Sequence, residues 1–167
     1  MCYGIAHMQP EPAAKILLLG LGNDILSDDA IGLLLVRKLR DEFAADERID
    51  ICETQEMGLA LLDFLSGYRE VVLVDAIQTG SAPPGTVHEL DAAGLKNLTG
   101  RTPHFLGVGE TLALGKQLEL PMPARVRIFA IEVADAHTLG TQLTAELDQA
   151  LPAILQRIRE TLRAALN

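Results

Sequence analysis

Short apolar runs alternate along the chain with amphipathic stretches. The runs at residues 15–20 and 70–75 are apolar on both faces, as expected for buried parallel strands. A further strand is expected at residues 49–52 and another at 125–133. Residues 86–90 alternate between apolar and polar side chains, which is typical of an edge strand. The short turn at residues 82–85 predicts that this strand pairs antiparallel with the one at 70–75.

The amphipathic stretches predict four helical regions. One opens at Ser27, Asp28 and Asp29, whose side chains can cap its first turn, and it carries an apolar stripe of Ile31, Leu34, Leu35, Leu39 and Phe43. A short helix is expected at 57–65, with Leu59, Leu62 and Leu65 facing the core, and another at 105–118. Residues 144–166 are helical by pattern, with a kink or a break into two abutting helices expected at Pro152.

The order of these elements defines the expected fold class. Strands that alternate with helices predict a three-layer α/β/α domain with a mostly parallel, five-stranded mixed sheet. Residues 1–14 contain two prolines and are expected to form a flexible N-terminal tail. Residues 15–167 are then expected to form a single α/β domain, a length that is sufficient to bury a core.

Composition narrows the classes of function. The net charge of −9 and the lack of a Lys and Arg cluster argue against nucleic acid as a partner. No apolar run approaches the roughly 18 residues of a membrane span, and residues 1–14 do not resemble a signal peptide. Two cysteines, Cys2 and Cys52, provide no disulfide framework. A cytoplasmic protein with a protein or small-molecule partner, and without a membrane or nucleic acid partner, is expected.

Polar side chains follow the predicted strands at the edge where α/β proteins place their sites. They are the loop from Asn23 to Asp29, Asp75 at the end of the strand at 70–75, and His104 in the loop before a helix. Two carboxylates and an imidazole suit a first-row divalent metal. Simpler roles stay open from the residues alone, because Asp29 can cap a helix, Asp75 a turn, and a lone histidine is often structural.

The glycines of this loop have a second interpretation that is less well supported. Gly20-Leu-Gly22 before a helix is similar to a dinucleotide-binding fingerprint, but its third glycine would fall at Ile25. The acidic residues Asp24, Asp28 and Asp29 would also repel a pyrophosphate.

Several segments together resemble one known family, the hydrogenase maturation proteases. The resemblance rests on Gly20-Leu-Gly-Asn-Asp-Ile-Leu-Ser-Asp-Asp-Ala-Ile-Gly32, Val71-Val-Leu-Val-Asp-Ala76, Pro84-Gly85, Thr102-Pro-His104 and Phe129-Ala-Ile-Glu-Val133. It extends from about residue 15 to the end of the chain. The acidic pair, the strand aspartate and the later histidine make the combination more specific than Gly-x-Gly-Asn alone, which peptidyl-tRNA hydrolases share.

The resemblance implies an endopeptidase that removes the C-terminal extension of the large-subunit precursor of a nickel–iron hydrogenase. It implies that Asp29, where many members have glutamate, Asp75 and His104 bind the nickel carried by the substrate and act in catalysis. Gly22 and Asn23 are expected to position the substrate segment. No organic cofactor is expected. The protein is expected to be a monomer. The alternatives are a non-proteolytic chaperone that binds the hydrogenase subunit or its metal, and a hydrolase similar to the peptidyl-tRNA hydrolases.

Overall fold

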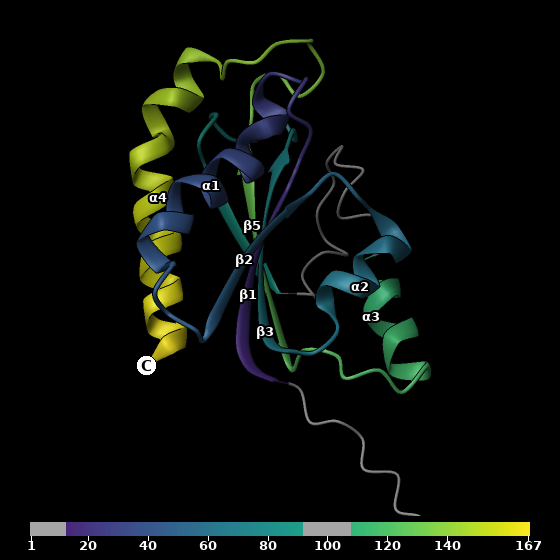
Figure 1. Ribbon diagram of the computed structural model, residues 1–167. Coiled ribbons are helices and arrows are strands. Elements are labelled where there is room, and N and C mark those ends of the chain that lie inside the picture. The colour runs from purple at the N-terminus through teal and green to yellow at the C-terminus, as the bar shows by residue number, and fades with distance from the viewer. Residues whose placement is uncertain (1–12, 92–107) are drawn as a thin grey trace, which may run out of the picture.

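The computed structural model describes residues 13–91 and 108–167, and the strands within them form one five-stranded sheet (Figure 1). The order across the sheet is β2-β1-β3-β5-β4. The first four of these strands run parallel, and β4 pairs antiparallel with β5 at the edge. The strands are β1 (Ala13–Leu21), β2 (Ile49–Thr54), β3 (Tyr68–Ile77), β4 (Val87–Asp91) and β5 (Arg125–Glu132).

Helices cover both faces of the sheet. On one face lie α1 (Ile31–Phe43) and α4 (Ala145–Leu166), and on the other lie α2 (Leu61–Leu65) and α3 (Val108–Gln117), as Figure 1 shows. Two short 3₁₀ turns, η1 (Asp28–Ala30) and η2 (Gly58–Ala60), precede α1 and α2. Alternate strand residues enter two separate apolar clusters, so Val72 and Val74 pack under α1 and α4 while Val71 and Leu73 pack under α2. The predicted three-layer α/β/α class with a mostly parallel mixed sheet is confirmed.

The predicted pairing of the edge strand is wrong. Strand β5 occupies the edge of β3, with eight residue pairs from Glu70–Arg125 to Ile77–Glu132, and β4 pairs with the outer side of β5. A short connection places β4 near β3 but does not fix the neighbour, because a longer crossover can insert a parallel strand between them. The long apolar strand β5 is buried better in that central position than the half-exposed β4.

The helix predictions hold in outline and differ in detail. In α1 the buried stripe includes Leu33 and Val36, whereas Leu34 is only half-buried. The segment at 57–65 buries Leu61 and Leu65, and Leu59 is 60% exposed. The C-terminal helix is continuous through Pro152, so the break into two helices is not found. Within residues 13–91 and 108–167, no helix is long and apolar enough to cross a membrane.

Two glycines allow α1 to lie directly on the sheet. A Cβ atom at Gly32 would collide with the carbonyl oxygen of Leu21 and would lie 2.5 Å from that of Val74. A Cβ atom at Gly20 would collide with the carbonyl oxygen of Gly32. Helix α1 therefore begins in contact with the ends of both β1 and β3, and this contact sets the position of the acidic turn that precedes it.

Candidate active site

Asp75 lies near the carboxyl end of β3 and is completely buried. The strand continues through Ala76 to Ile77, so the expectation that Asp75 is its last residue is wrong by two positions. The side chain shares the α2–α3 face with Leu73 and Ile77. One carboxylate oxygen accepts a hydrogen bond of 2.8 Å from the amide of Ala76. A carboxylate is costly to bury, and its hydrogen bonds must offset that cost.

Asp29 belongs to η1 and is 7% exposed. Gly22 lies so close to the backbone of Asp29 that a Cβ atom there would collide with its carbonyl oxygen. Three residues further on, Gly32 abuts the carbonyl of Val74, the residue before Asp75. Two buried carboxylates from segments far apart in sequence are thus brought to the same edge of the sheet, as the sequence predicts.

Asp28 has a different role from the helix cap that the sequence predicts. The N-terminus of η1 has no side-chain cap. The buried carboxylate of Asp28 instead accepts hydrogen bonds from the amides of Ala134, Asp135 and Thr144 and from the hydroxyl of Thr144, at 2.7–3.2 Å. Asp28 therefore ties η1 to the loop after β5 and to the start of α4.

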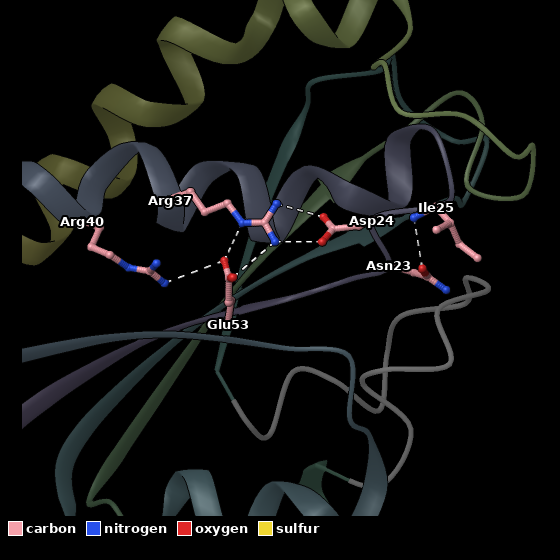
Figure 2. A network of polar contacts seen from close by, with 6 residues as sticks. All are labelled: Asn23, Asp24, Ile25, Arg37, Arg40 and Glu53. Carbon is pink, nitrogen blue, oxygen red and sulfur yellow. Dashed lines mark hydrogen bonds and ion pairs between the residues drawn. The ribbon is translucent and has the colours of Figure 1, made fainter.

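Asn23 and Gly22, the candidate substrate-positioning residues, lie at the turn after β1. Gly22 is buried with φ of +151°, a conformation that favours glycine, so a packing requirement already explains its identity. The side-chain oxygen of Asn23 accepts a hydrogen bond of 3.2 Å from the amide of Ile25 (Figure 2), and its backbone oxygen accepts one of 3.1 Å from the amide of Leu26. These bonds hold the turn in one conformation.

Arg37 of α1 fixes the same turn from its other side. Its guanidinium group donates two bonds to Asp24, of 2.8 and 3.0 Å, and two to Glu53 of β2, of 2.7 and 3.2 Å (Figure 2). Arg40 contributes a longer ion pair of 3.7 Å to Glu53. The hydrogen bonds that Arg37 donates to Asp24, and then those to Glu53, raise the pKa of Arg37 above its ordinary value. The charge of Asp24 is balanced here, so the loop is less acidic at its surface than its sequence suggests.

Glu132 and His88 form a second polar group on this edge that the sequence analysis did not single out. Glu132 is 1% exposed and accepts bonds from the amide and hydroxyl of Thr79, the amide of Gly80 and Nε2 of His88, at 2.7–3.1 Å. Burial would raise the pKa of Glu132, but the bonds from Thr79, Gly80 and His88 outweigh it and lower that pKa. The signal that was available is an acidic residue between Ile131 and Val133 in a buried strand.

His104, the third candidate ligand, lies outside the described residues. Within residues 13–91 and 108–167, no group of three or more His, Cys, Asp or Glu side chains is arranged to hold a metal ion. Of the three expected ligands, Asp29 and Asp75 lie within the described residues, and carboxylate oxygen is a donor that suits a divalent first-row metal.

Cys52 and Tyr68 are unsuited to catalysis by their surroundings. Burial, and then the nearby charge of Asp50, raise the pKa of the Cys52 thiol, so the nucleophilic thiolate is disfavoured. Burial and a hydrogen bond to Asp50 raise the pKa of Tyr68 to about 12. Neither side chain is therefore poised to act as a nucleophile or base near neutral pH.

The α/β/α fold of this chain, with its mostly parallel mixed sheet, is shared by solved structures of one class of protein. A hydrogenase-maturating endopeptidase from Escherichia coli, HybD, superposes with a TM-score of 0.77 at 24% identity, covering 90% of this chain and 93% of that one. The [NiFe] hydrogenase maturation protease HybD from Thermococcus kodakarensis superposes with a TM-score of 0.68 at 24% identity, covering 88% and 98%. At these identities the likeness concerns the fold.

Sequence relatives give the family. The Hydrogenase 2 maturation protease of Escherichia coli K12 is 29% identical over 154 residues, covering 88% of this chain and 92% of the relative. The hydrogenase expression/formation protein HupD of Rhizobium leguminosarum is 26% identical over 158 residues, covering 93% and 77%. The family model described as hydrogenase maturation protease matches residues 33–161. The chain belongs to the hydrogenase maturation protease family and is an endopeptidase.

Proposed function

We propose that this endopeptidase removes the C-terminal extension of a nickel-loaded [NiFe] hydrogenase large-subunit precursor. In this proposal Asp29, Asp75 and His104 bind the nickel ion that the substrate carries and take part in cleavage. The observation that carries the proposal is the burial of Asp29 and Asp75, brought from separate segments to one edge of the sheet in a protein of this family. His104 enters through the sequence resemblance described above.

The charges around the two aspartates support this choice of ligands. Asp24 is paired with Arg37, and Asp28 is surrounded by backbone and hydroxyl donors. Asp24 and Asp28 therefore have structural roles in the fold, and the ligands proposed at this edge are Asp29 and Asp75. An arriving nickel ion would offset the cost of burying two carboxylates, so productive binding would depend on a metallated substrate. Cleavage would then follow metal insertion and not precede it.

The donor set is consistent with two chemical roles of the substrate's nickel. The ion can polarise the carbonyl of the scissile peptide bond, or it can lower the pKa of a water molecule that attacks this bond. In either case one of the aspartates can serve as the general base. Asn23, which follows Gly22 at the turn after β1, is proposed to hold the substrate backbone together with the amide of Gly22.

The remaining expectations belong to the same proposal. The partner is the large-subunit precursor alone, with no nucleic acid, membrane or organic cofactor, and the protease acts as a cytoplasmic monomer. The two alternatives were a hydrolase similar to the peptidyl-tRNA hydrolases and a non-proteolytic chaperone. Neither has an observation in its favour, since the family consists of maturation proteases.

The test is to incubate the protein with nickel-loaded and nickel-free precursor and to measure the mass of the large subunit. Wild-type protein is expected to release a C-terminal peptide from the loaded form only. The variants Asp29→Ala, Asp75→Ala and His104→Ala are each expected to reduce the cleavage rate by about a hundredfold or more. An unchanged mass of the loaded precursor would refute the proposed function.

A matched control separates the site from general effects of lost charge. Asp41 is exposed on α1, and Asp41→Ala is expected to cleave at the wild-type rate. Circular dichroism should show that all variants remain folded. Wild-type activity in any one of the three site variants would remove that residue from the site.

A further inference from the structure

Strand β2 forms one edge of the sheet, and in the described part of the chain it has a strand on one side only. That neighbour is β1, which pairs with β2 in parallel from Ile16–Ile49 to Leu21–Thr54 without a shift of register. Edge strands are usually protected against a further strand by lysine, proline or a β-bulge. Strand β2, with the sequence Ile49-Asp-Ile-Cys-Glu-Thr54, has none of these. This edge is therefore open to pairing.

The register of β1 and β2 shows which backbone groups of β2 point away from the sheet. The amide of Ile16 donates a bond of 2.8 Å to the carbonyl of Arg48. In a parallel ladder alternate residues direct both backbone groups to the same side, so Asp50 also faces β1. Ile51 and Glu53 direct theirs outward, and these groups have no hydrogen bond to other described residues. An extended peptide beside β2 can bond to the amide and the carbonyl of both residues.

An open groove of about 390 Å³ lies along the same edge. It is lined by residues 49–52 of β2 and, from the end of α1, by Arg40 and Ala44. The carboxylate of Glu53 does not compete for the outward backbone groups, because Arg37 and Arg40 hold it against α1 (Figure 2). The edge thus offers both free backbone partners and space for a peptide chain.

The edge leads directly to the candidate site. Strands β1 and β2 end side by side, since Leu21 pairs with Thr54, and Gly22 and Asn23 follow at once. Strand β1 lies between β2 and β3, the strand that carries Asp75. Neighbouring strands are about 4.8 Å apart, so a strand added to β2 lies about 14 Å from β3. An extended chain covers this distance in about four or five residues, and it crosses the turn of Gly22 and Asn23 on the way.

We infer that the open edge of β2 binds an extended segment of the large-subunit precursor as an added strand, about four or five residues from the bond that is cut. The inference rests on the proposed function for the identity of the precursor. An endopeptidase acts on an extended chain, and an open strand that ends beside the site provides backbone partners for one. A second copy of this protein fits less well, because two copies with a net charge of −9 each repel one another. The added strand contributes affinity and register and takes no part in bond breaking.

Proline at position 51 tests the edge directly. Ile51→Pro removes an outward amide and places the ring where the added strand would lie, and proline is tolerated at such positions of edge strands. Ile51→Ala removes the same side-chain contacts but keeps the amide. With nickel-loaded precursor as substrate, the KM of Ile51→Pro is expected to exceed that of Ile51→Ala about tenfold, with kcat values within about twofold of each other. Equal KM values in the two variants would overturn the inference.

A second pair of variants leaves the strand unchanged, so the test does not depend on how well the proline variant folds. Ala44 is exposed and lines the groove, whereas its neighbour Ala45 is exposed and lines a different groove. Ala44→Trp is expected to raise KM about tenfold by filling the space beside β2, and Ala45→Trp to keep the wild-type KM. A wild-type KM in Ala44→Trp, or an equal increase in Ala45→Trp, would contradict the inference.

Equilibrium binding of nickel-loaded precursor separates this inference from the proposed function. If wild-type protein binds the precursor but does not cut it, the proposed function fails, and an about tenfold weaker Kd in Ile51→Pro than in Ile51→Ala still supports the edge. If wild-type protein cuts the precursor and both variants bind it equally, the proposed function stands and this inference fails. Sedimentation of the free protein examines the second copy. A wild-type dimer that Ile51→Pro loses would assign the edge to self-association and overturn the inference.

Discussion

Glu132 shows how much one buried carboxylate can organise at the scale of a residue. It ends β5, yet its four bonds reach the turn after β3 through Thr79 and Gly80 and the edge strand through His88. The three residues Thr79, Gly80 and His88 lie 44 to 53 positions away from it. Since bonds from four donors favour the ionised form, the charge on Glu132 stabilises the folded state.

Replacing Glu132 should change both stability and its dependence on acid. The folded-state pKa of Glu132 is below its ordinary value of 4.5, so its contribution is fully present above pH 4.5 and is lost as the pH falls through the folded pKa. Glu132→Gln is therefore expected to lower the free energy of unfolding by about 1–3 kcal/mol at pH 7. Below pH 4.5 the difference from wild type should shrink. Urea denaturation at several pH values measures both effects.

Glu89 provides the comparison on the neighbouring strand. Its carboxylate is 40% exposed and makes one ion pair of 3.3 Å with Arg157. Glu89→Gln should change the free energy of unfolding by less than about 0.5 kcal/mol at either pH, since exposed pairs contribute little. A Glu132→Gln protein as stable as this control at pH 7 would show that the buried bonds are not stabilising.

Close packing of α1 on the sheet is the main determinant of the site at the scale of elements. The backbone of α1 approaches β1 and β3 at Gly20 and Gly32, and the acidic turn η1 is carried to the end of β3 as a consequence. Arg37 then links α1 to the loop after β1 and to β2. The arrangement depends on backbone contact, which only a residue without a side chain permits at these positions.

Gly32→Ala should destabilise the protein by about 1–3 kcal/mol, because the new methyl group overlaps the carbonyls of Leu21 and Val74. The helix propensity of alanine works in the opposite direction and recovers less than about 1 kcal/mol. Gly109→Ala in α3 is the control, since nothing lies within 4 Å of its added Cβ atom. That change should be neutral or slightly stabilising, and thermal unfolding followed by circular dichroism compares the two. Equal behaviour of the two variants would contradict this account of the packing.

The pattern of the sequence predicts the ends of an element better than it predicts the element's neighbours. The ends of β2 and α4 agree with the expected ranges to within a few residues, because a continuous buried face imposes a clear periodicity. The partner of β4 was predicted wrongly, because strand order depends on which strand gains most from burial on both faces. Similarly, Leu59 was predicted in the core because a helical period does not reveal that the first turn extends beyond the sheet.

At the scale of the whole molecule, Asp28 connects distant parts of the chain at the carboxyl edge of the sheet. Its bonds to Ala134, Asp135 and Thr144 join residues 106 to 116 positions apart and connect the first turn of the fold to its last crossover. The same contact holds the loop between Asp135 and Thr144, which contains Leu139, against the turn that precedes α1. Loss of this carboxylate would leave buried amides without an acceptor.

Asp28→Ala is accordingly expected to lower the free energy of unfolding by about 2–4 kcal/mol. Asp28→Asn keeps one acceptor oxygen and should cost less than Asp28→Ala. Chemical denaturation monitored by far-UV circular dichroism gives the values, and the exposed Asp41→Ala should stay within about 0.5 kcal/mol of wild type. If Asp28→Ala were as stable as Asp41→Ala, the carboxylate would not be the connection described here.

The sequence by itself determined the fold class, the family and the candidate aspartates, because periodic burial and the motifs around Gly20 and Asp75 are local properties of the chain. The tertiary structure decided what each acidic residue of the loop does. Asp24 pairs with Arg37, Asp28 anchors a distant loop, and Asp29 lies at the end of β3. These three acidic residues of one loop take different roles because their partners come from segments that meet only in the folded chain. The pairing of Leu26 with Leu139 follows from the same meeting of distant segments, which no local pattern encodes.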